Sequence, residues 1–220
     1  MAHSPFSPSS AYRWMKCPLS VKLAPLYPQT TSAAATEGTR QHDVAASCLV
    51  KKTDSEEPGV RTYIEIIRKM HESFGGDLLV EYKVTLVKDL CWGTLDAGVV
   101  APSFLGVSDY KSGTKPVSAT GNPQLQIYAL GLLREFPMPR NAFISLAIVQ
   151  PRTTSGWPVK RYTPSVETLL KFKGEVFRAI DAAQAPNPVG VAGDHCGYCP
   201  AKLHCPAYLK AHGAKRVKLI

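Results

Sequence analysis

The cysteine spacing near the end of the chain constrains the fold more than any other feature of this sequence. The segment HCGYCPAKLHC, residues 195–205, places Cys196, Cys199 and Cys205 in a C-x2-C-x5-C pattern. A structural metal site or an iron–sulfur cluster usually takes four protein ligands. The pattern therefore predicts a metal centre whose fourth ligand comes from elsewhere in the chain.

The composition is typical of a soluble globular protein with a basic surface. The chain has 220 residues, of which 45% are hydrophobic and 20% are charged, and its formal net charge is +9. This length suits one domain that needs no disulfides, so we expect the cysteines to be ligands or buried thiols. No apolar run of about 18 residues and no secretory signal pattern is found, which favours a cytoplasmic protein without a membrane span. The positive charge favours nucleic acid as a partner, but a merely soluble basic protein is equally consistent with it.

Apolar periodicity predicts an alternation of helices and strands. Helical spacing and capping residues predict helices at 9–18, 33–52, 57–74, 122–136 and 163–183, the last opened by a Thr163 cap and Pro164. Alternating or β-branched segments predict strands at 77–87, 93–100, 104–111 and 141–151, with the second and third forming a hairpin. This order indicates an α/β fold with a mixed central sheet flanked by helices.

Two aspartates lie on the predicted hairpin. Asp96 lies in GTLDAGVV, and Asp109 and Lys111 end the next strand as VSDYKSG. Alternation places Asp109 and Lys111 on one face, and pairing of the strands would bring Asp96 beside Asp109. Adjacent carboxylates repel unless a cation lies between them, and hard oxygen ligands suit Mg²⁺ or Mn²⁺. The pattern favours metal-assisted phosphodiester hydrolysis, although both aspartates could instead cap turns at strand ends.

Three further residues, together with the two aspartates and Lys111, form a series of short motifs along the chain. His42 lies four residues after Gly38, and Gln124 and Tyr128 lie one turn apart on the helix predicted after Lys111. In this order they resemble the motifs of RecB-type nucleases in the PD-(D/E)xK superfamily. The segment SPSSAYRWMKCP resembles the N-terminal helix of the iron–sulfur branch, which includes the AddAB nuclease domain and the CRISPR-adaptation exonucleases. The segments EGTRQH, DYKSG and GNPQLQIYALG are most similar to small stand-alone phage and prophage nucleases.

The resemblance implies a PD-(D/E)xK restriction-endonuclease-like core and a terminal staple. It implies a single nuclease domain over 1–220, with the nuclease core at 33–189, iron–sulfur staple segments at 1–32 and 190–212, and a basic tail at 213–220. Cys17, Cys196, Cys199 and Cys205 would hold a 4Fe–4S cluster that joins the two ends of the chain. Tetrahedral Zn²⁺ remains the alternative, with His195 or His204 available to replace one cysteine.

The resemblance also implies a role for each residue of the site. His42, Asp96 and Asp109 would bind the catalytic Mg²⁺ or Mn²⁺, together with the carbonyl of Tyr110. Lys111 would position the attacking water and stabilise developing charge, while Gln124 and Tyr128 would contact DNA or brace the site. A lone helical histidine is more often a surface or core residue, and only the family pattern favours His42 as a ligand.

One residue differs from the family pattern, and the role of another is not assigned by it. Leu95 occupies the position of the proline for which the superfamily is named. Glu81 either lies near the metal or, as we expect, is an exposed strand residue paired with Lys83 or Lys88.

The expected function is a metal-dependent deoxyribonuclease that acts as an exonuclease on single-stranded DNA or DNA ends. The resemblance places it in phage recombination, replication or DNA degradation in a bacterial host cell, with a recombinase, single-strand-binding protein or helicase as a possible partner. The alternative is a non-catalytic DNA-binding or recombination adaptor that keeps the fold and the four-cysteine metal site. The intact series of His42, Asp96, Asp109 and Lys111 favours the enzyme.

Several other side chains lie outside this series. Tyr12, Trp14 and Trp92 could stack on splayed bases, although such aromatics more often belong to a core or its rim. Lys115 could reach a phosphate or simply lie in a flexible polar loop. Cys48 and Cys91 are predicted to be buried thiols because both lie in apolar segments.

Overall fold

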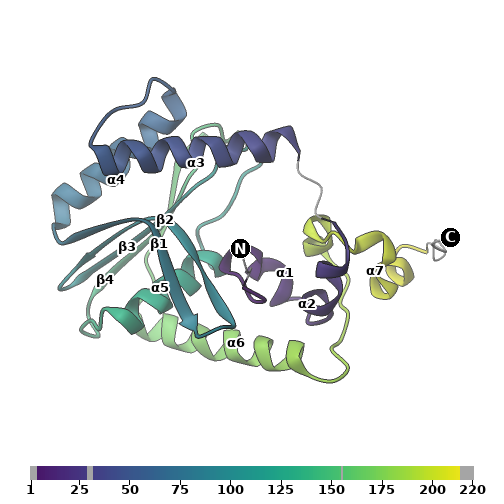
Figure 1. Ribbon diagram of the computed structural model, residues 1–220. Coiled ribbons are helices and arrows are strands. Elements are labelled where there is room, and N and C mark those ends of the chain that lie inside the picture. Colours follow the sequence, from purple (N-terminus) through teal and green to yellow (C-terminus); the bar gives the residue numbers. More distant parts are fainter. Residues whose placement is uncertain (1–3, 29–31, 155, 214–220) are drawn as a thin grey trace.

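A five-stranded mixed sheet lies between two pairs of helices (Figure 1). The computed structural model describes residues 4–28, 32–154 and 156–213. The strands follow the order β1 (Asp77–Val87), β2 (Cys91–Ala101), β3 (Phe104–Tyr110), β4 (Phe143–Val149) and β5 (Val159–Tyr162). All neighbours pair antiparallel except β3 and β4, which are parallel. A parallel pair needs a crossover connection, and the helix between β3 and β4 supplies it.

The helices cover both faces of the sheet. The long helices are α3 (Ala33–Lys51), α4 (Pro58–Phe74), α5 (Pro123–Glu135) and α6 (Val166–Gln184). Helices α3 and α4 lie on one face, where Tyr63 and Ile64 pack with Tyr110 and Val149 of the sheet. Helices α5 and α6 lie on the opposite face and form the larger core with β1 to β4. The mixed α/β architecture predicted from the sequence is therefore confirmed.

The chain ends form short helices beside this sandwich. The N-terminal ones are η1 (Pro8–Ser10), α1 (Ala11–Trp14), α2 (Leu19–Leu23) and η2 (Ala24–Leu26). The C-terminal ones are η3 (Asp194–Tyr198), η4 (Lys202–His204) and α7 (Pro206–Ala211). Figure 1 shows the two terminal segments side by side. Leu19 N–H donates to the Val189 carbonyl at 3.1 Å, Val191 N–H points to Cys17 Sγ at 3.4 Å, and Lys22 Nζ donates to the carbonyls of Ala185 and Pro186 at 2.8 and 3.2 Å.

The sequence-based elements agree with the structure except at short or capped segments. The predicted helix at 9–18 is divided into η1, α1 and a turn, and β5 was not predicted. The predicted Thr163 cap is wrong, because Ser165 accepts the hydrogen bond from Thr168 N–H and α6 begins at Val166. No helix in the described part of the chain is long and apolar enough to cross a membrane. Residues 214–220 of the predicted basic tail lie outside the described residues.

Cys48, Cys91 and Trp14 belong to the core. Cys48 and Cys91 are buried, as predicted, and burial raises the pKa of the Cys91 thiol to about 12. Trp14 is fully buried and donates its indole N–H to the Ser7 carbonyl at 2.9 Å. Trp14 is therefore a core residue and is not available to stack on a base.

Candidate active site

The register of β2 and β3 brings the two aspartates of the hairpin together. Ala97 pairs with Ser108, so Asp96 and Asp109 are the next residues opposite each other. The backbone N–H of Tyr110 donates to Asp96 Oδ2 at 2.8 Å, which holds this carboxylate against β3. The proximity expected from strand alternation is present, and the alternative that both aspartates merely cap turns does not describe this geometry.

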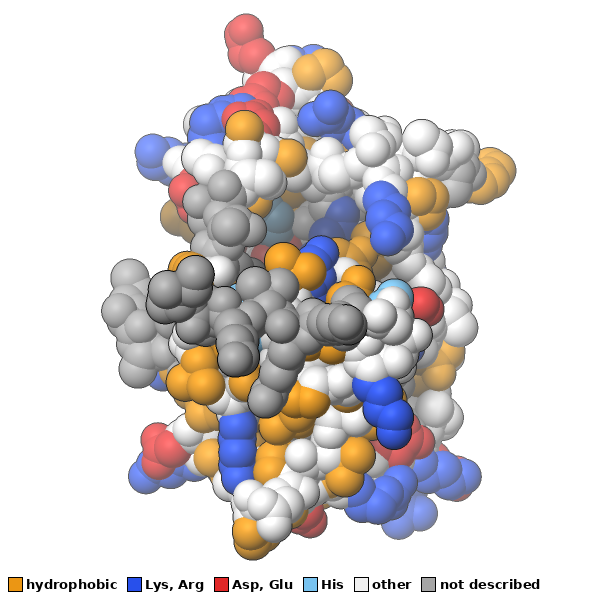
Figure 2. All heavy atoms as spheres, turned by 90° about the vertical axis from the view of Figure 1, so that its right-hand side faces the viewer, with side chains coloured by type: hydrophobic (Ala, Val, Ile, Leu, Met, Phe, Trp, Pro, Cys, Tyr) orange, Lys and Arg blue, Asp and Glu red, His pale blue; other side chains and the backbone are white. Residues whose placement is uncertain are grey.

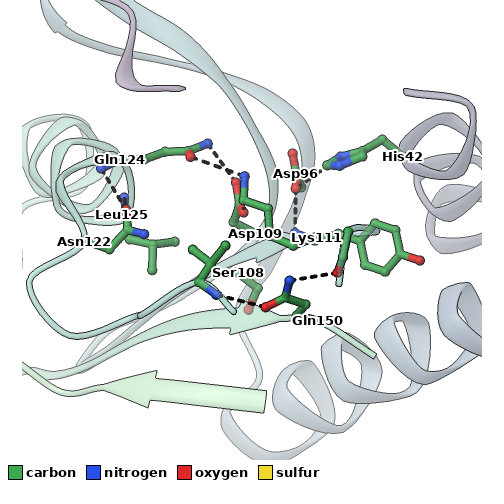
Figure 3. A network of polar contacts seen from close by, with 12 residues as sticks. His42, Asp96, Ser108, Asp109, Lys111, Asn122, Gln124, Leu125 and Gln150 are labelled. Atoms are coloured by element: carbon green, nitrogen blue, oxygen red, sulfur yellow. Dashed lines mark hydrogen bonds and ion pairs between the residues drawn. The ribbon is translucent and has the colours of Figure 1, made fainter. Parts of the chain in front are cut away.

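Helix α3 brings His42 to Asp96. His42 Nδ1 lies 3.2 Å from Asp96 Oδ2 (Figure 3). Burial by itself would lower the pKa of His42, but the hydrogen bond and the charge of Asp96 outweigh it and the pKa is raised. Gly38, one turn earlier, allows the close approach, since a Cβ added there would lie 3.0 Å from Ser112 Oγ in the loop after β3. The G-x3-H spacing thus has a steric basis in this fold.

Asp109 and Lys111 form a buried ion pair at the end of β3. Lys111 Nζ lies 2.8 Å from Asp109 Oδ2, and Asp109 is only 2% exposed. Burial raises the pKa of Asp109 to about 6, with Lys111 opposing and Asp96 adding to this shift. For Lys111, burial lowers the pKa, but the charge of Asp109 prevails and the pKa is raised, so the amine is protonated at neutral pH. Within the described residues, the Lys111 ammonium is the partner of the buried Asp109 Oδ2, and the contact is an ion pair without the geometry of a hydrogen bond.

Gln124 and Tyr128 contact the site from α5. The side chain of Asn122 caps α5 by accepting hydrogen bonds from the N–H groups of Gln124 and Leu125. This cap places Gln124 where its Nε2 donates to Asp109 Oδ1 at 2.7 Å and its Oε1 accepts from Lys111 at 3.5 Å. Tyr128 is buried and donates its hydroxyl to the Thr94 carbonyl at 2.6 Å. These contacts brace Asp109, Lys111 and the backbone of β2, and both side chains also line the cavity described below.

Glu81 is exposed on β1, as expected, but it also lies beside the candidate metal ligands. Its carboxylate is not paired with Lys83 or Lys88 in the described residues; it lies with His42 and Asp96, and the potential ligand atoms of these three residues are all within 4.8 Å of one another. The flanking pairs of β1 and β2 place Glu81 opposite Asp96. Burial, and then the charge of Asp96, raise the pKa of Glu81.

The backbone at Glu81 also marks the site. Its φ of 46° lies in the left-handed region, which costs a non-glycine residue on the order of 1–3 kcal/mol. Such residues cluster at functional sites, although Lys52 and Asp89 also have positive φ at a helix end and a turn. Directly opposed like charges further destabilise a sheet. Glu81, Asp96 and Asp109 lie opposite one another on three neighbouring strands. The sequence contains all three acidic residues, but their alignment is known only once the register of β1 against β2 is known.

These residues line one open cavity. His42, Asp96, Asp109, Lys111, Gln124 and Tyr128 line a hollow of about 400 Å³, to which the N-terminal segment contributes Ser4, Ser7 and Ser9. Figure 2 shows this hollow, in which basic, acidic and histidine side chains gather. A second hollow of about 390 Å³ adjoins it, since His42 and Asp96 line both and Glu81 lines the second. The structure therefore brings all side chains of the predicted series to one solvent-accessible place.

The four cysteines predicted as ligands lie in the two terminal segments that pack together. Cys17, Cys196 and Cys205 are buried and Cys199 is partly buried, and all are free thiols. Burial raises the pKa of Cys199, and neighbouring Cys17 and Cys205 add to this. Within the described residues, no three cysteine sulfurs lie within 4.8 Å of one another.

The two histidines that flank these cysteines contact other groups. His195 Nε2 lies 2.9 Å from the Val191 carbonyl, and His204 stacks on Tyr27 with ring centroids 4.5 Å apart. Neither contact involves a cysteine.

The fold and the site define a mixed α/β protein with a histidine, two aspartates and a protonated lysine in one cavity, and with Glu81 in the adjoining hollow. Residues 3–72 and 54–217 match the family described as "Protein of unknown function (DUF2800)", and the chain belongs to this family. It is also similar to a solved structure described as "Crystal structure of SSO0001". That similarity has a TM-score of 0.48 and 15% sequence identity, and covers 95% of this chain and 89% of the other.

Proposed function

We propose that this protein is a metal-dependent DNA nuclease of the PD-(D/E)xK type that acts as an exonuclease on single-stranded DNA or DNA ends. The observation that carries the proposal is the set of facing Asp96 and Asp109, with His42 and Lys111 within 3.2 Å of their carboxylates, in one open cavity. The formal net charge of +9 agrees with a polyanionic substrate.

The donor set suits a divalent cation. Three carboxylates lie in adjacent positions on neighbouring strands, and their repulsion is relieved by a cation between them. Asp109 adds a buried carboxylate beside Lys111, and His42 adds an imidazole to the oxygen ligands. Oxygen-rich sites with one imidazole suit Mg²⁺ or Mn²⁺. His42, Asp96, Asp109 and the carbonyl of Tyr110 would hold the ion, with Glu81 as a further ligand.

The residues of the site divide the chemistry between them. When bound, the cation would polarise a phosphate oxygen and lower the pKa of a water molecule. Lys111 is protonated, so it would orient the attacking water and stabilise the negative charge that develops on the phosphate, and it is not suited to act as the base. Gln124 forms hydrogen bonds with both Asp109 and Lys111, and so fixes the positions of the carboxylate and the ammonium group relative to each other.

The terminal cysteines support a structural cluster as part of the same proposal. Cys17, Cys196, Cys199 and Cys205 would hold a 4Fe–4S cluster that joins residues 1–32 and 190–212. A single Zn²⁺ with bonds of about 2.3 Å would need sulfurs about 4 Å apart, whereas each ligand of a cubane binds a different iron and the sulfurs lie farther apart. The influence of Cys17 and Cys205 on the pKa of Cys199 agrees with their lying near one another. A brown colour with stoichiometric iron in anaerobically purified protein would support the cluster, and colourless protein with stoichiometric zinc would support the alternative.

Digestion of end-labelled DNA tests the nuclease proposal. Single-stranded, duplex and circular DNA are incubated with the protein and Mg²⁺ or Mn²⁺; we expect linear single strands or ends to be degraded and circles to persist. Asp109→Ala and Lys111→Ala should each abolish cleavage without changing the fold. Asp181→Ala, which alters an exposed carboxylate on α6, is the matched control and should retain full activity.

Two results would contradict the proposal. Cleavage by Asp109→Ala at the wild-type rate would show that the active site is elsewhere. DNA binding without cleavage in either metal would instead support the non-catalytic adaptor.

A further inference from the structure

Two exposed tyrosines meet where the terminal segments lie side by side. Tyr12 of α1 and Tyr198 of η3 have ring centroids 6.4 Å apart and an interplanar angle of 83°. Tyr12 is 39% and Tyr198 is 60% exposed, so both rings are partly accessible to solvent although they contact each other. An aromatic pair this accessible contributes little to a core and offers a surface on which a planar group can stack.

Two lysines accompany the pair. Lys16 Nζ lies 4.2 Å from the centroid of the Tyr12 ring. Lys115 Nζ donates to the Tyr198 hydroxyl at 3.3 Å and lies 5.6 Å from the centre of that ring. The pair thus combines two aromatic faces with two positive charges, a combination that matches the bases and phosphates of a single strand.

The same surface is tied to the candidate active site. Lys115 follows Lys111 by four residues, which span at most about 14 Å when extended. The loop between them is held by Gln150, whose side chain bonds the carbonyls of Gly113 and Lys115 at 2.8 and 2.7 Å. On the other side, the turn before α1 contributes Ser7 and Ser9 to the cavity. A strand that leaves the cavity would therefore meet the two tyrosines within a few nucleotides.

We propose that Tyr12, Lys16, Lys115 and Tyr198 form a base-stacking platform that binds unpaired nucleotides and directs a single DNA strand into the cavity. This inference rests on the proposed nuclease function, because it assigns the cavity a DNA substrate. The platform selects single strands for a physical reason: an unpaired base can expose its π-face to an aromatic ring, whereas the bases of a duplex are already stacked on each other.

Fluorescence anisotropy with a labelled oligonucleotide, in EDTA so that the DNA stays intact, tests the platform. Each stacked base contributes about 1–3 kcal/mol, so Tyr198→Ala should weaken binding of single-stranded DNA by about tenfold. Tyr198→Phe keeps the ring and should bind with nearly wild-type affinity. Phe177→Ala is the matched control, because Phe177 on α6 is 38% exposed and has Lys173 5.7 Å from its ring centroid; its loss should leave DNA binding unchanged.

An abasic oligonucleotide of the same length provides a second test that needs no variant. The wild-type protein should bind it about tenfold more weakly than the normal oligonucleotide, and Tyr198→Ala should weaken this binding no further. Duplex binding should be insensitive to Tyr198→Ala. Equal affinity of the wild-type protein for normal and abasic strands, or an unchanged affinity in Tyr198→Ala, would overturn the platform.

The platform and the nuclease proposal fail separately. Base-dependent binding by a protein that never cleaves would support the platform while removing the nuclease function. Cleavage by a protein that does not distinguish abasic from normal strands would support the nuclease function and exclude the platform.

Discussion

Gln150 is the buried residue that supports the loop between the candidate active site and the tyrosine pair. Its side chain is almost inaccessible to solvent, and it makes three hydrogen bonds to the loop backbone. Its Nε2 donates to the carbonyls of Gly113 and Lys115, and its Oε1 accepts from the N–H of Val117 at 3.0 Å. We predict that Gln150→Leu, which removes all three bonds with little change in volume, destabilises the protein and releases this loop.

The magnitude follows from the surroundings of these bonds. A typical hydrogen bond contributes about 0.5–1.5 kcal/mol net, and a partner left buried and unsatisfied costs about 1–3 kcal/mol. Gly113 and Lys115 are exposed residues, so water can replace part of what their carbonyls lose. We therefore use the net value of about 1 kcal/mol for each bond. The loss of three bonds then lowers the free energy of unfolding by about 2–4 kcal/mol.

Urea unfolding followed by circular dichroism measures this decrease. The matched control is Ser118→Ala, which removes an exposed hydrogen bond of the same loop, from Ser118 Oγ to the Thr120 carbonyl at 3.3 Å. This control should change the free energy of unfolding by less than about 0.5 kcal/mol. A loss of less than about 1 kcal/mol for Gln150→Leu would refute the view that these bonds hold the loop.

Three further predictions concern the candidate cation and cluster. Glu81→Gln should weaken Mn²⁺ binding by about tenfold or more in calorimetry, because a charged group beside the ion is lost; a change below about twofold would remove Glu81 from the site. The pKa of Asp109 is raised to about 6 and that of His42 is also raised, so both are protonated at about pH 5 and must lose protons to bind the ion. The increase in Tm caused by Mn²⁺ should therefore be larger at about pH 8 than at about pH 5, and equal shifts would contradict this. Cys199→Ser should abolish the visible absorbance of the cluster and lower the Tm, whereas Cys91→Ser should keep the absorbance; absorbance that survives in Cys199→Ser would exclude this ligand.

Much of the fold was predictable because the period of the apolar residues records burial locally. The helix at 33–52 and the strand at 77–87 correspond to α3 and β1 with almost the same bounds. The closeness of Asp96 and Asp109 was also predictable, because a short hairpin leaves few possible registers. The short edge strand β5 was missed, since its four residues are too few for a period to be recognised and none of them is fully buried.

The remaining parts of the site were decided only when distant segments packed. Glu81 could face either side of the sheet, and only the register of β1 against β2 turns it toward Asp96. Likewise, nothing in the local sequence pairs Tyr12 with Tyr198, which come from opposite ends of the chain. Periodicity shows which face of a segment is buried, but the neighbour that buries it is chosen by the packing of the whole core. For that reason the elements and the hairpin could be derived from the residues alone, whereas the third carboxylate and the tyrosine pair required the folded chain.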